Sequence, residues 1–312
     1  MEHGGSRHDA HGGFRHDALI YRDAEELLGG ALPFLRAGLE AGEPVLVAVS
    51  EPRRALLQSE LGGDAGQVRF AAVEEAAHNP AGILALWKDF VDESGGRSVR
   101  GIGEAVWPGR DPAAVEECQR HESLLNVAFA PQPAWTLLCP YDAAGLPGEA
   151  IEEVAASHRL IWRDGRVEES PSFDGERDAL AGELPPPRAP AQAVSFALED
   201  LAEVRRRVRA TAETAGLAAD ATSALVTAAS ELAANSVMHG GGNGELRLWR
   251  EDDRLLVEVT DHGLLDQPLA GRLRPGLSQE GGRGLWLANR LCDLVQIRSG
   301  AGGTTVRLHV LA

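Results

Sequence analysis

The chain has 312 residues, of which 44% are hydrophobic and 25% are charged, so it holds enough apolar material for two packed domains. Its formal net charge of -17 repels polyphosphate backbones and disfavours direct binding of nucleic acid. The 3 cysteines form no C-x-x-C pair, which argues against a disulfide framework and a tetrathiolate zinc site and predicts a reducing cytoplasm.

The N-terminal segment and the lysine content exclude two further classes. The segment lacks the basic-then-apolar order of a signal peptide, and no apolar run approaches the roughly 18 residues that span a bilayer, so we expect a soluble protein with no membrane segment. The only lysine, Lys88, lies in LALWKDF and does not end a Gly-x4-Gly-Lys loop. A phosphate-loop NTPase built on that lysine is therefore excluded.

The first half of the chain alternates helical and strand-like signals. Residues 1–13 are rich in Gly and His and are predicted to be disordered. Leucines at helical spacing predict a helix over residues 23–42 that Gly42 stops. The pattern predicts further helices at 81–93 and 112–128 and buried strands at 44–50, 68–73, 98–106 and 135–142. This alternation predicts a parallel α/β sheet over residues 14–173.

Three consecutive prolines mark residues 174–192 as a semi-rigid linker, after which the order of elements changes. A strand at 193–198 precedes two helices, at 199–216 and 219–238, and Asp220 is predicted to be the N-cap of the second. Strands are then predicted at 244–252 and 253–263, a helix at 283–292 and a closing hairpin at 294–300 and 303–311. Helices on one face of a mixed, largely antiparallel sheet predict an α+β sandwich over residues 193–312.

Polar and glycine residues recur at the ends of these predicted elements. Glu231 and Asn235 are four residues apart and share one face of a helix, so both side chains can serve one site. Taken alone, each such pair or glycine turn is more often a solvated face or a loop. The set comprises ELAAN at 231–235, DHG at 261–263, GGRGL at 281–285 and GTT at 303–305. Together, in this order and each at a strand or helix end, these pieces are hard to explain as coincidence.

With these motifs, residues 193–312 resemble the Bergerat-fold (GHKL) ATPases, and most closely the anti-sigma-factor serine kinases. The resemblance implies ATP and Mg²⁺ as cofactors, with Glu231 as the catalytic base and Asn235 as the Mg²⁺ ligand. Asp261 would accept the exocyclic amine of adenine, which Gly263 leaves room to approach. The remaining implied nucleotide contacts are Gly282, Arg283 (or Arg274 in its place), Gly284 and Leu285, with Thr304 or Thr305 supporting the base.

The flanking sequence narrows the activity that this nucleotide site serves. The helix predicted at 199–215 contains no histidine, which disfavours an autophosphorylating histidine kinase, and the domain is too small for a chaperone or a topoisomerase. Two functions remain open. One is a serine/threonine protein kinase acting on an anti-anti-sigma-type antagonist protein, and the other is a non-catalytic, ATP-dependent module that sequesters a sigma factor or antagonist. The resemblance also implies a homodimer.

Residues 14–173 resemble the MEDS sensory domain, which is related in fold to the RecA-like ATPases, and this implies sensory control of the ATPase domain. The resemblance rests on the segments HDALIYRDAEELLGGALPFLRAGLEAGEPVLVAV, SVRGIGEAVWPG, RHESLLNVAF and LLCPYDAAGL. A small-molecule ligand is expected at the C-terminal ends of the strands. Candidate contacts are His16, Tyr21, Glu104, His121, Glu122, Asn126, Cys139, Tyr141, Asp142 and His158.

The alternative to ligand binding is a structural role, in which these histidines and the cysteine are hydrogen-bonded core residues. Such a structural role is the more common of the two. His121, Cys139, His158 and Glu104 are all accepted metal-ligand types, but their spacing matches no recognised metal pattern, so we expect no metal there. The terminal His3, His8 and His11 would bind metal only adventitiously.

Overall fold

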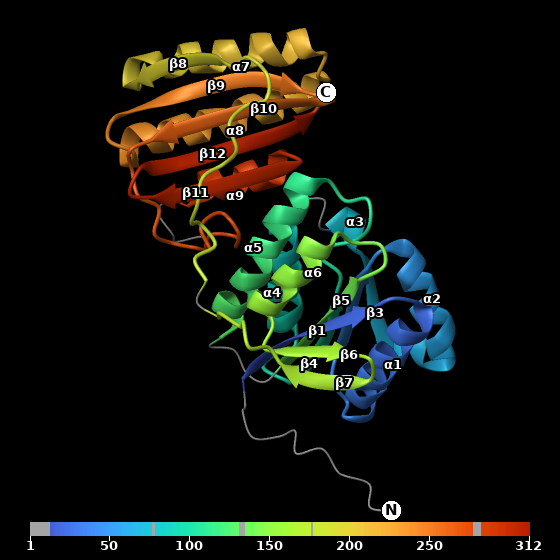
Figure 1. Cartoon of the computed structure of the whole chain (residues 1–312). Coiled ribbons are helices and arrows are strands. Elements are labelled where there is room, and N and C mark those ends of the chain that lie inside the picture. The colour runs from blue at the N-terminus through green and yellow to red at the C-terminus, as the bar shows by residue number, and fades with distance from the viewer. Residues whose placement is uncertain (1–12, 77–78, 131–134, 176, 277–281) are drawn as a thin grey trace, which may run out of the picture. The chain divides into compact units, whose positions relative to one another are not determined.

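The computed structural model describes residues 13–76, 79–130, 135–175, 177–276 and 282–312 (Figure 1). The chain divides into two compact units. The first comprises residues 1–74, 87–110 and 125–177, and the second comprises residues 75–86, 111–124 and 178–312. Among the helices described, none combines the length and the apolar character that a membrane crossing requires.

A seven-stranded sheet with the order β3-β2-β4-β5-β1-β6-β7 forms the centre of the first unit. Its strands are β1 (Phe14–Tyr21), β2 (Val45–Val49), β3 (Val68–Ala72), β4 (Val99–Gly103), β5 (Trp135–Asp142), β6 (Leu160–Arg163) and β7 (Arg166–Glu169). Neighbouring strands are parallel, as predicted, except for the antiparallel pair β6 and β7 at one edge.

Helices pack on both faces of this sheet, because its central strands are apolar on both sides. On one face lie α1 (Ala24–Glu40) and α2 (Glu51–Leu61), whose buried leucines join the strands in one core. On the other face, Trp87 of α4 (Ala81–Glu93) packs over Gly101 and Gly103 of β4, and Phe129 of α5 (Pro112–Phe129) contacts Trp135. The remaining helices are α3 (Val73–Ala76), α6 (Gly148–Ser157) and the 3-10 helix η1 (Gly62–Gln67).

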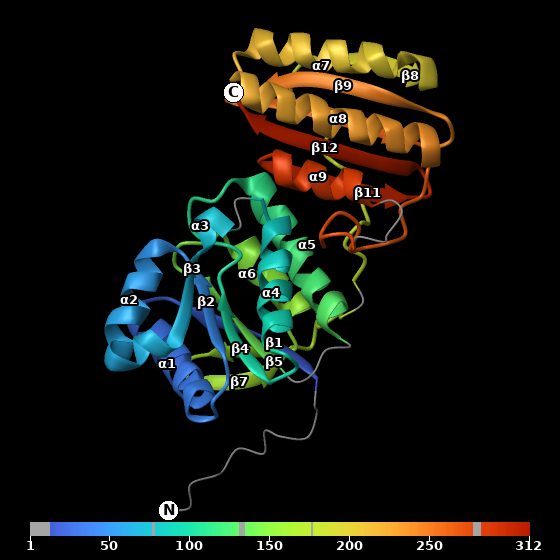
Figure 2. The ribbon, with the colours of Figure 1, turned by 180° about the vertical axis from the view of Figure 1, so that it is seen from behind.

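The second unit contains a five-stranded sheet with the order β11-β12-β10-β9-β8, in which every neighbouring pair is antiparallel. Its strands are β8 (Gln192–Ala197), β9 (Asn243–Glu251), β10 (Arg254–Asp261), β11 (Leu294–Gly300) and β12 (Gly303–Leu311). The helices α7 (Leu201–Ala215), α8 (Ala219–His239) and α9 (Arg283–Leu291) lie side by side over one face of the sheet (Figure 2). The predicted α+β sandwich is confirmed, and the sheet is fully antiparallel where a mixed one was expected.

The predicted N-cap of α8 is wrong. The N-cap residue is Ala218, whose carbonyl accepts from the Thr222 amide at 2.8 Å. Its side chain makes no capping hydrogen bond. Asp220 instead lies inside the first turn, where its carboxylate interacts favourably with the positive end of the helix dipole. The residue therefore favours this helix start by charge and not by a capping hydrogen bond.

The proline-containing segment before β8 packs against the second unit. Leu180 is buried in the core of this unit, and its carbonyl accepts from the Ser299 amide at 2.9 Å. Farther along, the Pro185 carbonyl accepts from Arg307 at 2.8 Å, and Arg307 also pairs with the buried Glu258. This segment therefore crosses the sheet face opposite the helices (Figure 1).

Candidate functional site

Helix α8 presents Glu231 and Asn235 to the first turn of α9. A β-carbon placed on Gly284 would lie 3.0 Å from Asn235 Nδ2 and 3.1 Å from Glu231 Oε2, so both side chains lie against that turn. A side chain at position 284 would therefore need both neighbouring side chains to shift by a few tenths of an ångström. The helical spacing of the two residues therefore brings a carboxylate and a carboxamide to one helix N-terminus.

Asp261 ends strand β10, and its carboxylate is held on both oxygens. Ser236 Oγ of α8 donates to Oδ2 at 2.6 Å, and the Gly263 amide donates to Oδ1 at 2.8 Å. Each carboxylate oxygen can still accept a further hydrogen bond. A β-carbon on Gly263 would lie 2.7 Å from the carbonyl oxygen of His239, the last residue of α8. Glycine at position 263 therefore avoids a clash with the backbone at the end of this helix.

Strand β12 contributes one of its two threonines to this region. Thr304 Oγ1 donates to the Gly263 carbonyl at 2.8 Å and lies 2.9 Å from Ser299 Oγ. Because side chains alternate along a strand, Thr305 points to the opposite face, where its hydroxyl lies 3.3 Å from that of Thr260. Thr304 is therefore the threonine that supports the Asp261 turn.

The N-terminus of α9 supplies backbone amides to the same place. Gly282 is the N-cap residue, with a φ of 76° that favours glycine. The free amides of such a first turn, together with the helix dipole, attract anions. Gly281 of the motif lies outside the described residues.

These groups line one cavity of about 560 Å³. The cavity includes Glu231 and all the expected nucleotide contacts except Thr305, and Arg274 is not among its lining residues. The expected residues in its wall are Glu231, Asn235, Asp261, Gly263, Gly282, Arg283, Gly284, Leu285 and Thr304. The structure thus brings together four motifs that are separated by up to 73 residues in the sequence.

Sequence reasoning missed several residues of this cavity. Ser236, which orients Asp261, follows directly after the ELAAN motif, and its spacing gave no signal. Met238 and Leu264 line the cavity and are 65% and 69% exposed, which gives it an apolar rim. An apolar rim suits the faces of a purine ring, and an amide oxygen, a carboxylate and a helix N-terminus suit Mg²⁺ and phosphate oxygens. The residues present therefore fit Mg-ATP.

The sensory-ligand candidates fall into two groups in the structure. In the first, Arg53 at the start of α2 lies between acidic and phenolic groups at the C-terminal ends of three strands. Its guanidinium lies 3.0 Å from Glu104 Oε1 and 2.9 Å from Asp142 Oδ2 and donates to the Tyr21 hydroxyl. Burial raises the pKa values of Glu104 and Tyr21, and the charge of Arg53 opposes this in both. Sequence reasoning missed Arg53, which partners these three candidates.

The second group is fully buried. Ligand atoms of His16, Glu122, Cys139 and His158 all lie within 4.8 Å of one another. Asn126 bonds to His16 at 3.2 Å, and the Tyr141 ring packs edge-on against His158, with ring centres 5.5 Å apart. The structure therefore separates Glu104 from Cys139 and His158, and His121, which is buried on α5, is not a member of this group.

Comparison with known proteins assigns a family to each half of the chain. Residues 15–159 match the MEDS family model, the methanogen/methylotroph DcmR sensory domain, and residues 194–310 match the histidine kinase-like ATPase domain. Among solved structures, the RsbU and RsbW domains of Rv1364c from Mycobacterium tuberculosis match with 23% sequence identity and a TM-score of 0.30. That match covers 39% of this chain and 32% of the other.

No protein of curated function matches the chain significantly. The two family matches leave the segment from 160 to 193 between them. The chain therefore carries a segment of the MEDS sensory-domain family followed by a segment of the histidine kinase-like ATPase domain family.

Proposed function

We propose that the chain is a cytoplasmic signalling regulator whose C-terminal domain binds Mg-ATP and transfers the γ-phosphate to a serine or threonine of a partner protein. The observation that supports this proposal is the approach of Glu231 and Asn235 to Gly284 at the N-terminus of α9. It unites a proton acceptor, an oxygen ligand for a hard cation and a phosphate-binding helix end in one cavity. When bound, Mg²⁺ neutralises charge on the phosphates.

Each side chain then has a defined task. The Glu231 carboxylate accepts the proton of the partner's serine or threonine hydroxyl. The hydroxyl oxygen bonds to the γ-phosphorus, and ADP leaves with the oxygen that bridged the β- and γ-phosphates. Asn235 supplies its amide oxygen to the cation, and the amides at the start of α9 hold phosphate oxygens. Asp261, fixed by Ser236 and Gly263, accepts the adenine amine.

The partner follows from the resemblance to anti-sigma-factor kinases. We place it among anti-anti-sigma-type antagonist proteins, with a sigma factor as the second candidate, and a homodimer of the chain is part of the same proposal. The family matches of both halves support a signalling role of this kind.

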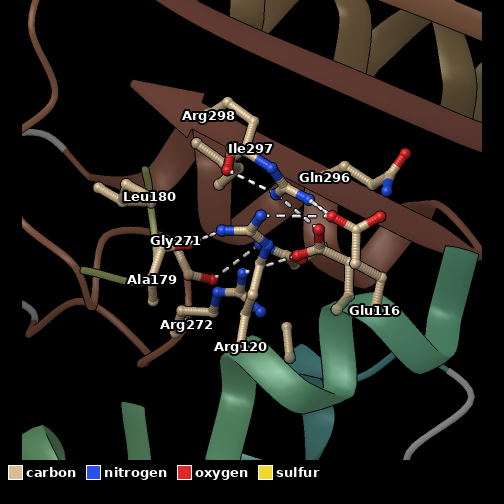
Figure 3. A network of polar contacts seen from close by, with 12 residues as sticks. Glu116, Arg120, Ala179, Leu180, Gly271, Arg272, Gln296, Ile297 and Arg298 are labelled. Carbon is tan, nitrogen blue, oxygen red and sulfur yellow. Dashed lines mark hydrogen bonds and ion pairs between the residues drawn. The ribbon is translucent and has the colours of Figure 1, made fainter. Parts of the chain in front are cut away.

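A buried ion-pair network within the second unit supports control of the ATP cavity through helix α5 (Figure 3). Arg298 of β11 bonds to Glu117 at 2.6 Å and to Glu116 at 2.7 Å, and Arg272 lies 3.4 Å from Glu117. Arg272 follows the segment that contributes Ala270 to the cavity wall. These ion pairs therefore connect α5 to the segment that borders the cavity, and this connection supports the proposed control.

The test separates binding from transfer. Asn235→Ala should weaken Mg-ATP binding by about 10- to 100-fold, the size of a lost hydrogen bond to a charged group, measured by calorimetry. Glu231→Gln should retain binding but slow phosphate transfer by about 10²- to 10⁴-fold, measured with γ-labelled ATP in extract of the native cell. Thr227→Ala, an exposed change on α8 outside the cavity wall, is the control.

Three outcomes are informative. Unchanged Mg-ATP affinity of Asn235→Ala would contradict the assigned site. Binding without any transferred phosphate, combined with an ATP-dependent complex in the same extract, would identify the non-catalytic sequestering function instead. Equal transfer by the parent and by Glu231→Gln would remove Glu231 from the mechanism.

A further inference from the structure

The buried group of His16, Glu122, Cys139 and His158 has the chemistry of a metal centre. It joins two imidazoles, a thiol and a carboxylate, all buried, with one ligand atom from each within 4.8 Å of the others. Around a tetrahedral Zn²⁺ the nitrogen and sulfur ligands lie about 3.5 Å apart, as bond lengths of about 2.0 and 2.3 Å require. The measured separation of His16 Nε2 from Cys139 Sγ is 3.3 Å.

Hydrogen bonds orient the first histidine toward a shared centre. His16 Nδ1 lies 3.2 Å from Asn126 Oδ1, and Asn126 Nδ2 donates to the Ser157 carbonyl at 2.8 Å. Because the amide nitrogen of Asn126 is used in that bond, its oxygen faces His16 and accepts from Nδ1–H. This tautomer leaves the Nε2 lone pair directed to Cys139.

The second histidine follows the same rule. His158 Nδ1 lies 2.9 Å from the Val154 carbonyl oxygen, an acceptor only, so Nδ1 carries the proton. Its Nε2 is therefore the basic nitrogen, and the two imidazole rings lie 4.1 Å apart between centres. An Nδ1–H bonded to a carbonyl or amide oxygen with Nε2 as donor atom is the arrangement of metal-ligating histidines.

The carboxylate and the surroundings complete the argument. Glu122 precedes Asn126 by four residues on α5, so both side chains project from the same face of that helix. Phe14 stacks on His16, and Tyr141 packs on His158. An apolar shell of this kind lowers the local dielectric constant and strengthens the binding of a cation by charged ligands.

We propose that His16, Cys139, His158 and Glu122 bind one first-row transition-metal ion, with Zn²⁺ as the first candidate. Two imidazoles and one thiolate select a borderline or soft cation over Mg²⁺ or Ca²⁺. On binding, the Cys139 thiol loses its proton to solvent, so that the ion is held by a thiolate. This site is independent of the ATP cavity, and its presence does not depend on kinase activity.

The test uses the full chain with His3, His8 and His11 changed to Ala, since these terminal histidines would bind metal adventitiously. After dialysis against Zn²⁺ and removal of loose ions, elemental analysis should find one Zn²⁺ per chain. Titration with Co²⁺ should produce a near-ultraviolet charge-transfer band from the thiolate. Cys139→Ser should abolish that band, and Cys292→Ser, a buried cysteine of the ATPase domain, should leave it unchanged.

Asn126→Ala separates the metal site from a merely structural hydrogen bond. If Asn126 positions a ligand, this variant should keep the Co²⁺ band but bind Zn²⁺ about 10- to 100-fold more weakly in competition with a chelating indicator. No band in the parent protein, or a band that persists in Cys139→Ser, would overturn the proposal and identify the group as a hydrogen-bonded core. A folded Asn126→Ala with unchanged Zn²⁺ affinity would also count against it.

Discussion

The C-terminal cavity, which we propose binds ATP, and the buried histidine-cysteine group are both polar sites, but they differ in the size of the ligand that each can hold. The cavity has a volume of about 560 Å³ and includes exposed residues such as Met238 and Leu264. The histidine-cysteine group is buried throughout, and its ligand atoms lie within 4.8 Å of one another. An open, partly apolar cavity suits a ligand that exchanges, whereas a closed group of donors has room only for a single ion.

The largest change in stability is expected from substitution of Glu117, which lies 3.4 Å from Arg272 in the segment that borders the cavity. Glu117 is fully buried between Arg298 and Arg272, so Glu117→Gln leaves buried positive charge uncompensated. We expect a loss of about 3–5 kcal/mol in the free energy of unfolding, measured by urea denaturation. Its neighbour Glu116, whose side chain is 42% exposed, is the matched control, and Glu116→Gln should cost less than about 1 kcal/mol.

Glu117→Gln should also weaken Mg-ATP binding, because it releases Arg272. Wild-type stability and ATP affinity in this variant would show that the ion-pair network holds neither α5 nor the cavity. Mg-ATP binding in the cavity would then be independent of α5.

His309 is a buried histidine of strand β12 that is not part of the proposed metal site. Burial and the nearby Arg254 and Arg307 lower its pKa to about 4, below the unfolded value of 6.5. The unfolded chain therefore binds a proton between these pH values and the folded chain does not. This group contributes its full stability above pH 6.5, and the contribution, about 3 kcal/mol, is lost as the pH falls to 4.

His309→Gln should flatten the fall in stability between pH 6.5 and 4, measured by denaturation at several pH values. His262→Gln, at an exposed position outside the cavity wall, should leave the slope unchanged. Equal slopes in the parent and in His309→Gln would assign the acid sensitivity to other groups.

The smallest effect expected here comes from Gly284→Val. Its side chain would meet Asn235 and Glu231 at about van der Waals contact or closer and shift both from their positions. Misplacement of this order costs about 10²-fold in rate, so phosphate transfer should fall by that factor. Gly300→Val, where a β-carbon meets no atom within 4 Å, should transfer phosphate at the parent rate. Equal rates in both variants would show that the cavity is wider at this point than the structure indicates.

The grouping of the four motifs around the C-terminal cavity could be predicted because their residues lie in short segments whose local geometry is fixed. One helical turn joins Glu231 to Asn235, and an Asp-x-Gly bend follows a strand, so each pair is placed by its own element. The choice between Thr304 and Thr305 stayed open, because it depends on the register of β12, which a strand pattern does not define. Sequence also gave no indication of Arg53, whose role arises only when three strand ends meet.

The members of the histidine-cysteine group were each predicted as candidate ligand contacts, but their grouping at one place was not predicted. His16, Cys139 and His158 come from three elements, and β1, which carries His16, was not predicted as a strand. The helices α2 and α6 and the hairpin of β6 and β7 were missed as well, because their apolar residues are few or half-buried. By residue type alone, His121, Cys139, His158 and Glu104 could be named together as ligand types, without a recognised metal spacing, and Glu104 bonds to Arg53 in the structure.

Helix α5 carries the carboxylates that pair with two buried arginines. Glu116 and Glu117 are adjacent in its second turn, and both bond to Arg298, while Glu117 also lies 3.4 Å from Arg272. Successive residues of a helix point about 100° apart, so the two carboxylates leave the helix in different directions. One helical turn thus supplies two negative charges where two guanidinium groups are withdrawn from water, which offsets the desolvation cost of both arginines.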